Sequence, residues 1–578
     1  MKCTSKYNSL KPKIRYSIII GSISFVILLI VIVIVAVVKS KSKNELNGTN
    51  IGAYLKTPDS SQLQYRLGNG IGWFEGSYPS ESVRDLMAYA GYDGMRKKLR
   101  ADLFVIWGYG CELETCILNQ KYGILDVVGY LAKPHKMHSS NKTEDSEACY
   151  PAHLYEPIWL SNGKVNPNNY WAFFVNETVT MYKKYIKIWE TWNEPDYVRN
   201  VDTSKWETSP PNPDDLLHWH GTIFEYIRLL RITYEVAKKA DPSCWVATGG
   251  LGYPSFLDGI MRYTDNPDNG KLTKEYPAYG GAYFDCDAYH KYPQWGSYDM
   301  ETGESIDDMG SDSHAKKVVT LKKNHRYIMK KYGFGDKYPE KLFINTETGL
   351  NSGEGGIGGD LVRRNWIIKL ALMCLEYDVR QLHILNLQDD EGMGDYEHVG
   401  AFVSNEEGYT HLKSSSKGRR ILKKMNLGKY VFDKEKSKKF RKSLPANLTG
   451  IVLKRKFPKE KNESYYYQYM YSVWIECIKN EVEGEIVTKL DIPFDPLKLD
   501  WLGNEERKKQ NSKFAITNTP IFLLGNEGLS GLAIFFIVLG SIIGVVLLAF
   551  IGLYCFKRFI QKKTIPFDKH LLSSLIKS

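Results

Sequence analysis

Two apolar segments of the chain end at a glutamate, and each could place a carboxyl group where chemistry occurs. Residues 188–196 read Ile-Trp-Glu-Thr-Trp-Asn-Glu-Pro-Asp, and residues 341–349 read Lys-Leu-Phe-Ile-Asn-Thr-Glu-Thr-Gly. Pro195 cannot donate a hydrogen bond to a sheet, so it marks the point where a strand gives way to a loop. A pair of carboxyl groups at such strand ends can supply both a proton and a nucleophile.

This pair of roles is the chemistry of a retaining glycosidase, in which the two carboxyl groups are about 5 to 5.5 Å apart. One protonates the leaving oxygen and later activates water, while the other attacks the anomeric carbon. Glu194 and Glu347 are far apart in the sequence. They can meet only if both strands end at the mouth of one barrel, where such folds place their catalytic groups.

Residues 189–196 resemble the acid/base strand of the clan A glycoside hydrolases. Within that clan, the run Glu-Thr-Trp-Asn-Glu-Pro-Asp is similar to family 39, which holds α-L-iduronidases and β-xylosidases. The resemblance extends coarsely over residues 65–425 and implies a (β/α)8 TIM barrel. It implies that Glu194 is the acid/base on the fourth strand and Glu347 the nucleophile on the seventh.

The resemblance also suggests residues that contact the substrate. Asn193 matches the asparagine that contacts the sugar 2-hydroxyl, and Arg96 is a candidate for the arginine that supports the nucleophile. His290 and Tyr292 resemble the His-x-Tyr of the clan's sixth strand, and Trp192 is a further candidate. Residues 385–390 lack the tryptophan that the eighth strand often offers to the sugar, so the substrate identity stays open.

Structural roles compete with catalytic ones for several of these residues. Glu190 is expected in an ion pair inside the barrel, and the alternative for Arg96 is a solvated position at a helix end. The carboxylates that compete with Glu347 for the nucleophile role are Glu354, Asp389, Asp390 and Glu391. Three tryptophans near predicted loops are candidate platforms for sugar stacking: Trp206, Trp219 and Trp295.

The order of predicted elements supports a barrel, because short apolar strands alternate with longer helical stretches. Strands are expected at 104–107, 182–192, 245–248, 282–289, 341–345 and 381–387. Helices are expected at 82–90, 214–240, 314–331 and 361–376. Periodicity alone does not distinguish a closed barrel from an open sheet. No GxGxxG fingerprint or Walker loop supports a nucleotide role.

The distribution of charge argues for membrane anchoring and against a nucleic-acid partner. The net charge is +11, and most of it lies in residues 1–15 and 557–578. Each basic tail borders an uncharged apolar segment, 16–38 or 528–556, long enough to cross a bilayer. We therefore predict two transmembrane helices, the first a signal anchor, with both tails in the cytosol. Five N-x-[ST] sequons, starting at Asn47, Asn141, Asn176, Asn447 and Asn462, fall between them.

Outside the barrel we expect a linker at 39–64 and a small β-rich accessory region at 426–515. Nine cysteines are present, and Cys111 and Cys116 are the most plausible local disulfide pair. No cysteine or histidine motif suggests zinc.

The sequence therefore predicts an α/β protein: a (β/α)8 barrel with a β-rich unit, flanked by two transmembrane helices. The expected activity is retaining hydrolysis of an extracytoplasmic oligosaccharide, polysaccharide or glycoconjugate, with no metal or organic cofactor. The membrane is that of the secretory pathway or the cell surface. Two alternatives keep the fold: a catalytically silent barrel that binds glycans, and a transglycosidase that uses the same residues.

Overall fold

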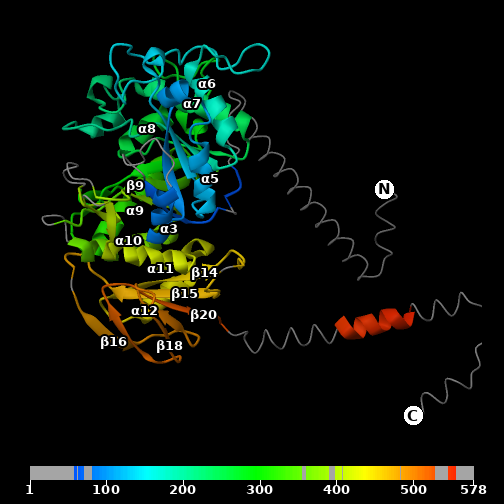
Figure 1. Cartoon of the computed structure of the whole chain (residues 1–578), viewed down its shortest axis with the longest axis vertical. Coiled ribbons are helices and arrows are strands. Elements are labelled where there is room, and N and C mark those ends of the chain that lie inside the picture. The colour runs from blue at the N-terminus through cyan, green and yellow to red at the C-terminus, as the bar shows by residue number, and fades with distance from the viewer. Residues whose placement is uncertain are drawn as a thin grey trace, which may run out of the picture.

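The protein folds around a closed barrel of eight parallel strands (Figure 1). The computed structural model describes residues 58–60, 63–70, 81–125, 127–353, 359–389, 397–405, 408–461, 463–481, 483–527 and 544–554. The spatial order of the strands is β1-β10-β9-β6-β5-β4-β3-β2. Their bounds are β1 Arg66–Gly70, β2 Gly94–Arg100, β3 Val127–Ala132, β4 Ile186–Thr191, β5 Trp245–Ala247, β6 Cys286–His290, β9 Leu342–Thr348 and β10 Val379–Ile384. The predicted barrel is confirmed.

Helices follow the strands and cover the outside of the barrel, as βα units require. They are α3 Glu81–Ala90, α4 Ala101–Trp107, α5 Leu113–Lys121, α6 Tyr170–Tyr182, α7 Ile223–Ala240, α8 Pro254–Arg262, α9 Ser311–Lys331, α10 Gly359–Glu376 and α11 Ser414–Lys424. Short 3-10 turns, η3 Lys136–His138, η4 Thr203–Glu207, η5 Pro213–Asp215 and η6 Gly280–Tyr283, lie in the connections.

Several predicted elements need correction. Residues 104–107 belong to helix α4, not to a strand; Ile106 and Trp107 are exposed there, so the apolar run does not mark a buried strand. Helix α7 begins later than the predicted residue 214, because Thr222 and Glu225 form a capping box that fixes its start. Strands β1, β2 and β3 were not predicted, and β2 reads Gly-Met-Arg-Lys-Lys-Leu-Arg, which has no apolar run.

The barrel interior is apolar at one level and polar at another. Apolar side chains from β3, β4, β6 and β9 form one cluster, which includes Val128, Ile188, Ala288 and Ile344. Farther along the same strands, toward their C-terminal ends, the side chains become polar, as at Glu190 and Thr346, both inaccessible to solvent. The change places charged groups beneath the mouth of the barrel.

The accessory unit is a six-stranded sheet of order β13-β14-β15-β20-β17-β18. Its strands are β13 Tyr430–Phe432, β14 Leu448–Arg455, β15 Tyr469–Ile475, β17 Leu497–Leu499, β18 Glu505–Arg507 and β20 Ile521–Gly525, with helix α12 Lys434–Ser443 beside β14. Further pairs are β16 Glu485–Lys489 with β19 Lys513–Thr517, β7 Ser297–Asp299 with β8 Glu304–Ile306, and β11 Phe402–Asn405 with β12 Gly408–Leu412. Because β20 is central to the sheet, the unit extends past the expected end at residue 515.

The barrel and the accessory sheet share one apolar core. Side chains from α9, α10 and α11 belong to the same buried cluster as side chains from β15, β17 and β20, and Figure 1 shows α10 and α11 between the barrel and this sheet. Asp312 of α9 fixes the contact: it accepts hydrogen bonds from Trp474 Nε1 at 2.8 Å and the Cys477 backbone N–H at 2.7 Å. Its carboxylate also pairs with the buried Lys369 ammonium at 2.6 Å.

The predicted first membrane segment, 16–38, lies outside the described residues, and of the second, 528–556, only residues 544–554 are described, as a helix. In the described part of the chain, none of the helices combines the length and the apolar character needed to cross a bilayer. The sequons at Asn141 and Asn447 are exposed. Cys111 carries a free thiol, so the expected Cys111–Cys116 disulfide is absent.

Candidate active site

A strained turn at the end of β4 presents Glu194. Trp192 has a φ of 75° and Glu194 a φ of 47°, in the left-handed region that bulky residues rarely adopt. The turn is held by the Glu194 backbone N–H, which donates to the Gly249 carbonyl at 2.6 Å. The Asp196 carboxylate accepts two further bonds, from the backbone N–H groups of Gly252 and Tyr253, both at 2.8 Å. Burial raises the pKa of Asp196 to about 6.

Glu347 lies on β9, the seventh strand of the barrel in sequence order, and two side chains hold its carboxylate. Arg96 of β2 places Nη1 3.2 Å from Oε2, and the Tyr292 hydroxyl donates to Oε1. Arg96, the candidate support of the nucleophile, thus contacts Glu347, and Tyr292 contacts it as well. The buried position of Arg96 excludes the solvated alternative.

His290, the last residue of β6, lies between the two glutamates. Its Nδ1 is 2.8 Å from Oε1 of Glu194 and 3.9 Å from Oε2 of Glu347, and its Nε2 is 3.0 Å from the Thr346 hydroxyl. One oxygen of each glutamate and a ring nitrogen of His290 all lie within 4.8 Å of one another. The glutamate side chains are 20% and 18% exposed, so the pair remains accessible from the barrel mouth.

A second histidine, which the sequence did not indicate, also contacts Glu194. His218 Nδ1 lies 3.2 Å from Oε2 of Glu194, and the His218 ring stacks on Tyr197 with centroids 4.5 Å apart. His218 belongs to the loop between β4 and α7, far from any strand-end pattern. Only its place after the Asn-Glu-Pro strand could have drawn attention to it.

The two histidines set the protonation of Glu194. Burial raises the pKa of the Glu194 carboxyl, but the bonds to His218 and His290 outweigh burial and lower its pKa below the ordinary value. Burial lowers the pKa of His290, but the Glu347 charge and the bond to Glu194 outweigh it and raise its pKa. The contact therefore favours an ionised Glu194 beside a protonated His290.

A buried charge network supports the site from below. Arg96 binds Glu190 with Nε to Oε2 at 2.6 Å and Nη2 to Oε1 at 3.1 Å, so the expected ion pair of Glu190 is confirmed. The same Nη2 donates to the Asn193 side-chain carbonyl at 2.7 Å. Thr346 donates to Glu190 at 2.8 Å. Arg96 therefore connects the strands that carry both glutamates.

The tryptophan predictions fare unevenly. Trp192 is 2% exposed, packs against Trp171 and Trp219, and donates Nε1 to the His218 carbonyl at 2.7 Å. This buried position does not support direct contact with substrate; Trp192 instead anchors the His218 loop. Trp219 and Trp206 are also buried, whereas Trp295 is 56% exposed. Its backbone N–H bonds the Tyr292 carbonyl at 3.3 Å, so Trp295 remains a candidate stacking platform.

Asp389, a competitor for the nucleophile role, has a structural position instead. It is bound by Lys413 Nζ at 2.6 Å and by the Gly400 backbone N–H at 2.9 Å. Glu354, Asp390 and Glu391 lie outside the described residues.

The donor atoms of Glu194, His290 and Glu347 are close enough to consider a metal ion. The Arg96 guanidinium lies 3.2 Å from Glu347, so it would repel a cation placed beside that carboxylate. The position of Arg96 therefore disfavours a metal ion beside Glu347.

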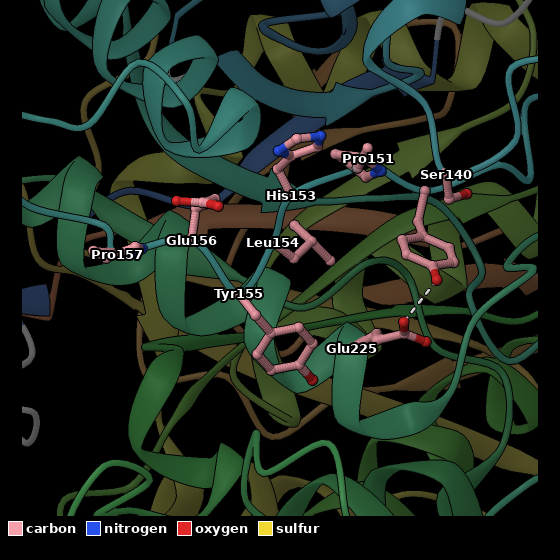
Figure 2. A pocket seen from close by; sticks show the side chains of 10 residues that line it. Ser140, Pro151, His153, Leu154, Tyr155, Glu156, Pro157 and Glu225 are labelled. Atoms are coloured by element: carbon pink, nitrogen blue, oxygen red, sulfur yellow. Dashed lines mark hydrogen bonds between the residues drawn. The ribbon is translucent and has the colours of Figure 1, made fainter.

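A separate cavity of about 470 Å³ lies beside the loop that follows β3 (Figure 2). Its lining includes Tyr150, His153, Tyr155, Glu156 and Glu225, and the Tyr150 hydroxyl donates to Glu225 at 2.6 Å. Neither catalytic candidate lines it. The chemistry of paired carboxylates, not cavity size, therefore locates the candidate active site.

Comparison with known proteins supports the fold. No protein-family profile matches the chain, and no curated protein matches it. A solved family 39 glycoside hydrolase from the gut symbiont Bacteroides cellulosilyticus WH2 matches with a TM-score of 0.50 and 15% identity, covering 82% of this chain and 83% of that one. At this identity the likeness establishes a shared fold, in agreement with the resemblance seen in the sequence.

Two further solved structures are less similar. The catalytic domain of family 30 xylanase C from Talaromyces cellulolyticus has a TM-score of 0.47 and 11% identity, covering 81% of this chain and 98% of that one. A monomeric β-xylosidase from Caulobacter crescentus CB15 has a TM-score of 0.42 and 12% identity, covering 82% and 98%.

Proposed function

We propose that the protein is a retaining glycoside hydrolase, with Glu347 as nucleophile and Glu194 as acid/base. The observation that carries the proposal is the pair of accessible carboxylates at the ends of two barrel strands, with oxygens within 4.8 Å of each other. This separation suits retention, because inverting enzymes leave about 6.5 to 9.5 Å for a water molecule.

In the first step Glu347 attacks the anomeric carbon and the bond to the leaving oxygen breaks as that oxygen receives a proton. Arg96 and the Tyr292 hydroxyl both donate to the Glu347 carboxylate and hold it in place. Their donors also fix its orientation, so the carboxylate does not have to reorganise during the reaction. Asn193, oriented by Arg96, is the proposed contact for the sugar 2-hydroxyl.

The proton for the leaving group is held jointly by Glu194 and His290. In the free protein their contact lowers the pKa of Glu194 and raises the pKa of His290, so it favours a carboxylate beside an imidazolium. Transfer of the shared proton along the 2.8 Å contact produces the acid form of Glu194, which can then protonate the glycosidic oxygen. Glu194 becomes ionised again and activates the water that releases the sugar from Glu347.

The substrate class is an oligosaccharide, polysaccharide or glycoconjugate. The test uses the full-length protein with a panel of aryl glycosides and polysaccharides, in wild type and in Glu194→Ala and Glu347→Ala. Glu301→Ala, at an exposed glutamate away from the pair, is the matched control. We expect activity in wild type and control, and its loss in both site variants. Azide should restore Glu194→Ala with a product of retained configuration and Glu347→Ala with one of inverted configuration.

Other outcomes identify the alternatives. Glycan binding without turnover, unchanged in both variants, would refute hydrolysis and leave a carbohydrate-binding barrel. Turnover that appears only with an added acceptor sugar, giving a longer glycan, would identify a transglycosidase.

Membrane anchoring is proposed separately. Its support is the apolar character of segments 16–38 and 528–556 together with the helix at 544–554, whose apolar side chains are 48% to 70% exposed. The barrel would then lie outside the cytosol, in the secretory pathway or at the cell surface. Retention in the membrane fraction after alkaline carbonate extraction, and a mass decrease on removal of N-glycans that Asn447→Gln reduces, test the two parts of this proposal.

A further inference from the structure

A second cluster of potential ligand groups lies between two connections at the barrel rim. Glu144 and Cys149 belong to the connection between β3 and α6, and His220 to the connection between β4 and α7. A carboxylate oxygen, the thiol sulfur and a ring nitrogen of these residues all lie within 4.8 Å of one another. The three donors are of three different chemical types, and two separate loops bring them together.

The spacing of His220 and Glu144 suits a shared tetrahedral cation better than a direct bond. His220 Nδ1 is 3.8 Å from Oε2 of Glu144, which is too long for a hydrogen bond. Ligands at about 2.0 to 2.3 Å from a tetrahedral Zn²⁺ are separated from one another by about 3.3 to 3.8 Å. The atoms therefore need to move little to surround an ion.

The donors are held by bonds that do not depend on an ion. The His220 backbone N–H donates to the Ala148 carbonyl at 2.9 Å, which joins the two loops beside Cys149. The Asn141 side-chain amide donates to Oε2 of Glu144 at 3.2 Å. Cys149 is 1% exposed, whereas the Glu144 and His220 side chains are 44% and 42% exposed. The site is thus fixed on its inner side and open on its outer side.

We propose that Glu144, Cys149 and His220 bind one Zn²⁺, with water at the fourth position. A mixed set of thiolate, imidazole and carboxylate suits the borderline-soft Zn²⁺, while Mg²⁺ and Ca²⁺ prefer oxygen ligands alone. On binding, the thiol loses its proton to solvent and the sulfur coordinates the ion. No oxidation or reduction is involved.

The ion would act as a clamp on the loop that carries His218. His220 lies two residues beyond His218, whose Nδ1 is 3.2 Å from Glu194. The ion would contact neither Glu194 nor Glu347, so its role is to position a loop. The proposal does not rest on hydrolytic activity, because metal content and spectra can be measured on an inactive protein.

The test measures zinc in the purified full-length protein after incubation with micromolar Zn²⁺ and desalting. We expect about one ion per chain in wild type and in the matched control Cys111→Ser, whose thiol lies outside the cluster. Cys149→Ser and His220→Asn should lose it. Loading with Co²⁺ should give a thiolate-to-cobalt charge-transfer band in wild type that is missing in Cys149→Ser.

Glu144→Gln provides a variant that leaves the buried part of the fold untouched, because this side chain is exposed. Competition with a chelator should show its zinc affinity weakened at least 10-fold, with an unchanged near-UV circular dichroism spectrum. Wild-type protein that takes up no zinc overturns the proposal. The proposal is also overturned if Cys149→Ser and His220→Asn still bind zinc while Glu347→Gln does not. The ion would then occupy the candidate active site.

Discussion

Replacement of Arg96 by methionine should destabilise the protein strongly, because it leaves a buried charge without its partner. Arg96 makes two bonds to Glu190, at 2.6 and 3.1 Å, and the Glu190 side chain is inaccessible to solvent. After Arg96→Met, Glu190 keeps only the bond from Thr346. Breaking a buried ion pair by removing one partner costs about 3 to 5 kcal/mol.

A second variant separates the charge effect from lost packing. Glu190→Gln has the same shape without the charge, and an unsatisfied neutral group costs about 1 to 3 kcal/mol. The double variant Arg96→Met/Glu190→Gln should therefore be more stable than Arg96→Met alone by about 2 kcal/mol.

The assay is urea unfolding of the wild type, both single variants and the double variant at pH 7, followed by tryptophan fluorescence. The slope of the free energy of unfolding against urea must stay constant across the set. A double variant no more stable than Arg96→Met would refute the reasoning, since the loss would then come from packing around the Arg96 side chain.

The remaining predictions concern activity and pH. His290→Gln removes the partner that shares the proton with Glu194, so the alkaline limb of the kcat/KM profile should move to lower pH; an unchanged limb contradicts the shared proton. Tyr292→Phe removes a hydrogen bond to the charged Glu347, worth about 1.5 to 3 kcal/mol, so kcat should fall about 10- to 100-fold in steady-state assays without loss of stability. Burial raises the pKa of Asp196 to about 6, above the ordinary aspartate value of 3.8. The protonated Asp196 carboxyl therefore adds to the free energy of unfolding at pH values below 3.8, and this contribution is lost as the pH rises through 6. Wild type should lose about 2 kcal/mol between pH 4 and pH 7 relative to Asp196→Asn, measured by urea unfolding at each pH; parallel pH dependence of the two proteins counts against this assignment.

The sequence predicted the parts of the site that follow from strand-end patterns. Glu194, His290 and Glu347 each end or nearly end an apolar strand, and the barrel topology then brings them together. The pattern works because parallel strands place their C-terminal ends at the same mouth. Arg96 was harder to interpret, since β2 is rich in charged residues and only the closed barrel turns its side chain inward.

Other features depend on contacts that no local pattern encodes. His218 reaches Glu194 through a loop, and the effect of two histidines on the pKa of Glu194 requires their positions in space. The apolar run at Phe104–Trp107 was misinterpreted as a strand because short apolar runs are ambiguous between strand and helix. Trp192 was a candidate for substrate contact, but it has a positive φ and its ring is buried in the aromatic core.

The contact of Asp312 with Trp474, Cys477 and Lys369 has a consequence for how the molecule unfolds. If the β-rich unit detached, Asp312 would lose its hydrogen bonds from Trp474 and Cys477. The apolar faces of α10 and α11 would then be exposed to water. Barrel and sheet should therefore melt in a single cooperative transition, and a fragment ending near residue 425 should aggregate. The smallest independently folding version of this protein must reach the end of β20, at Gly525.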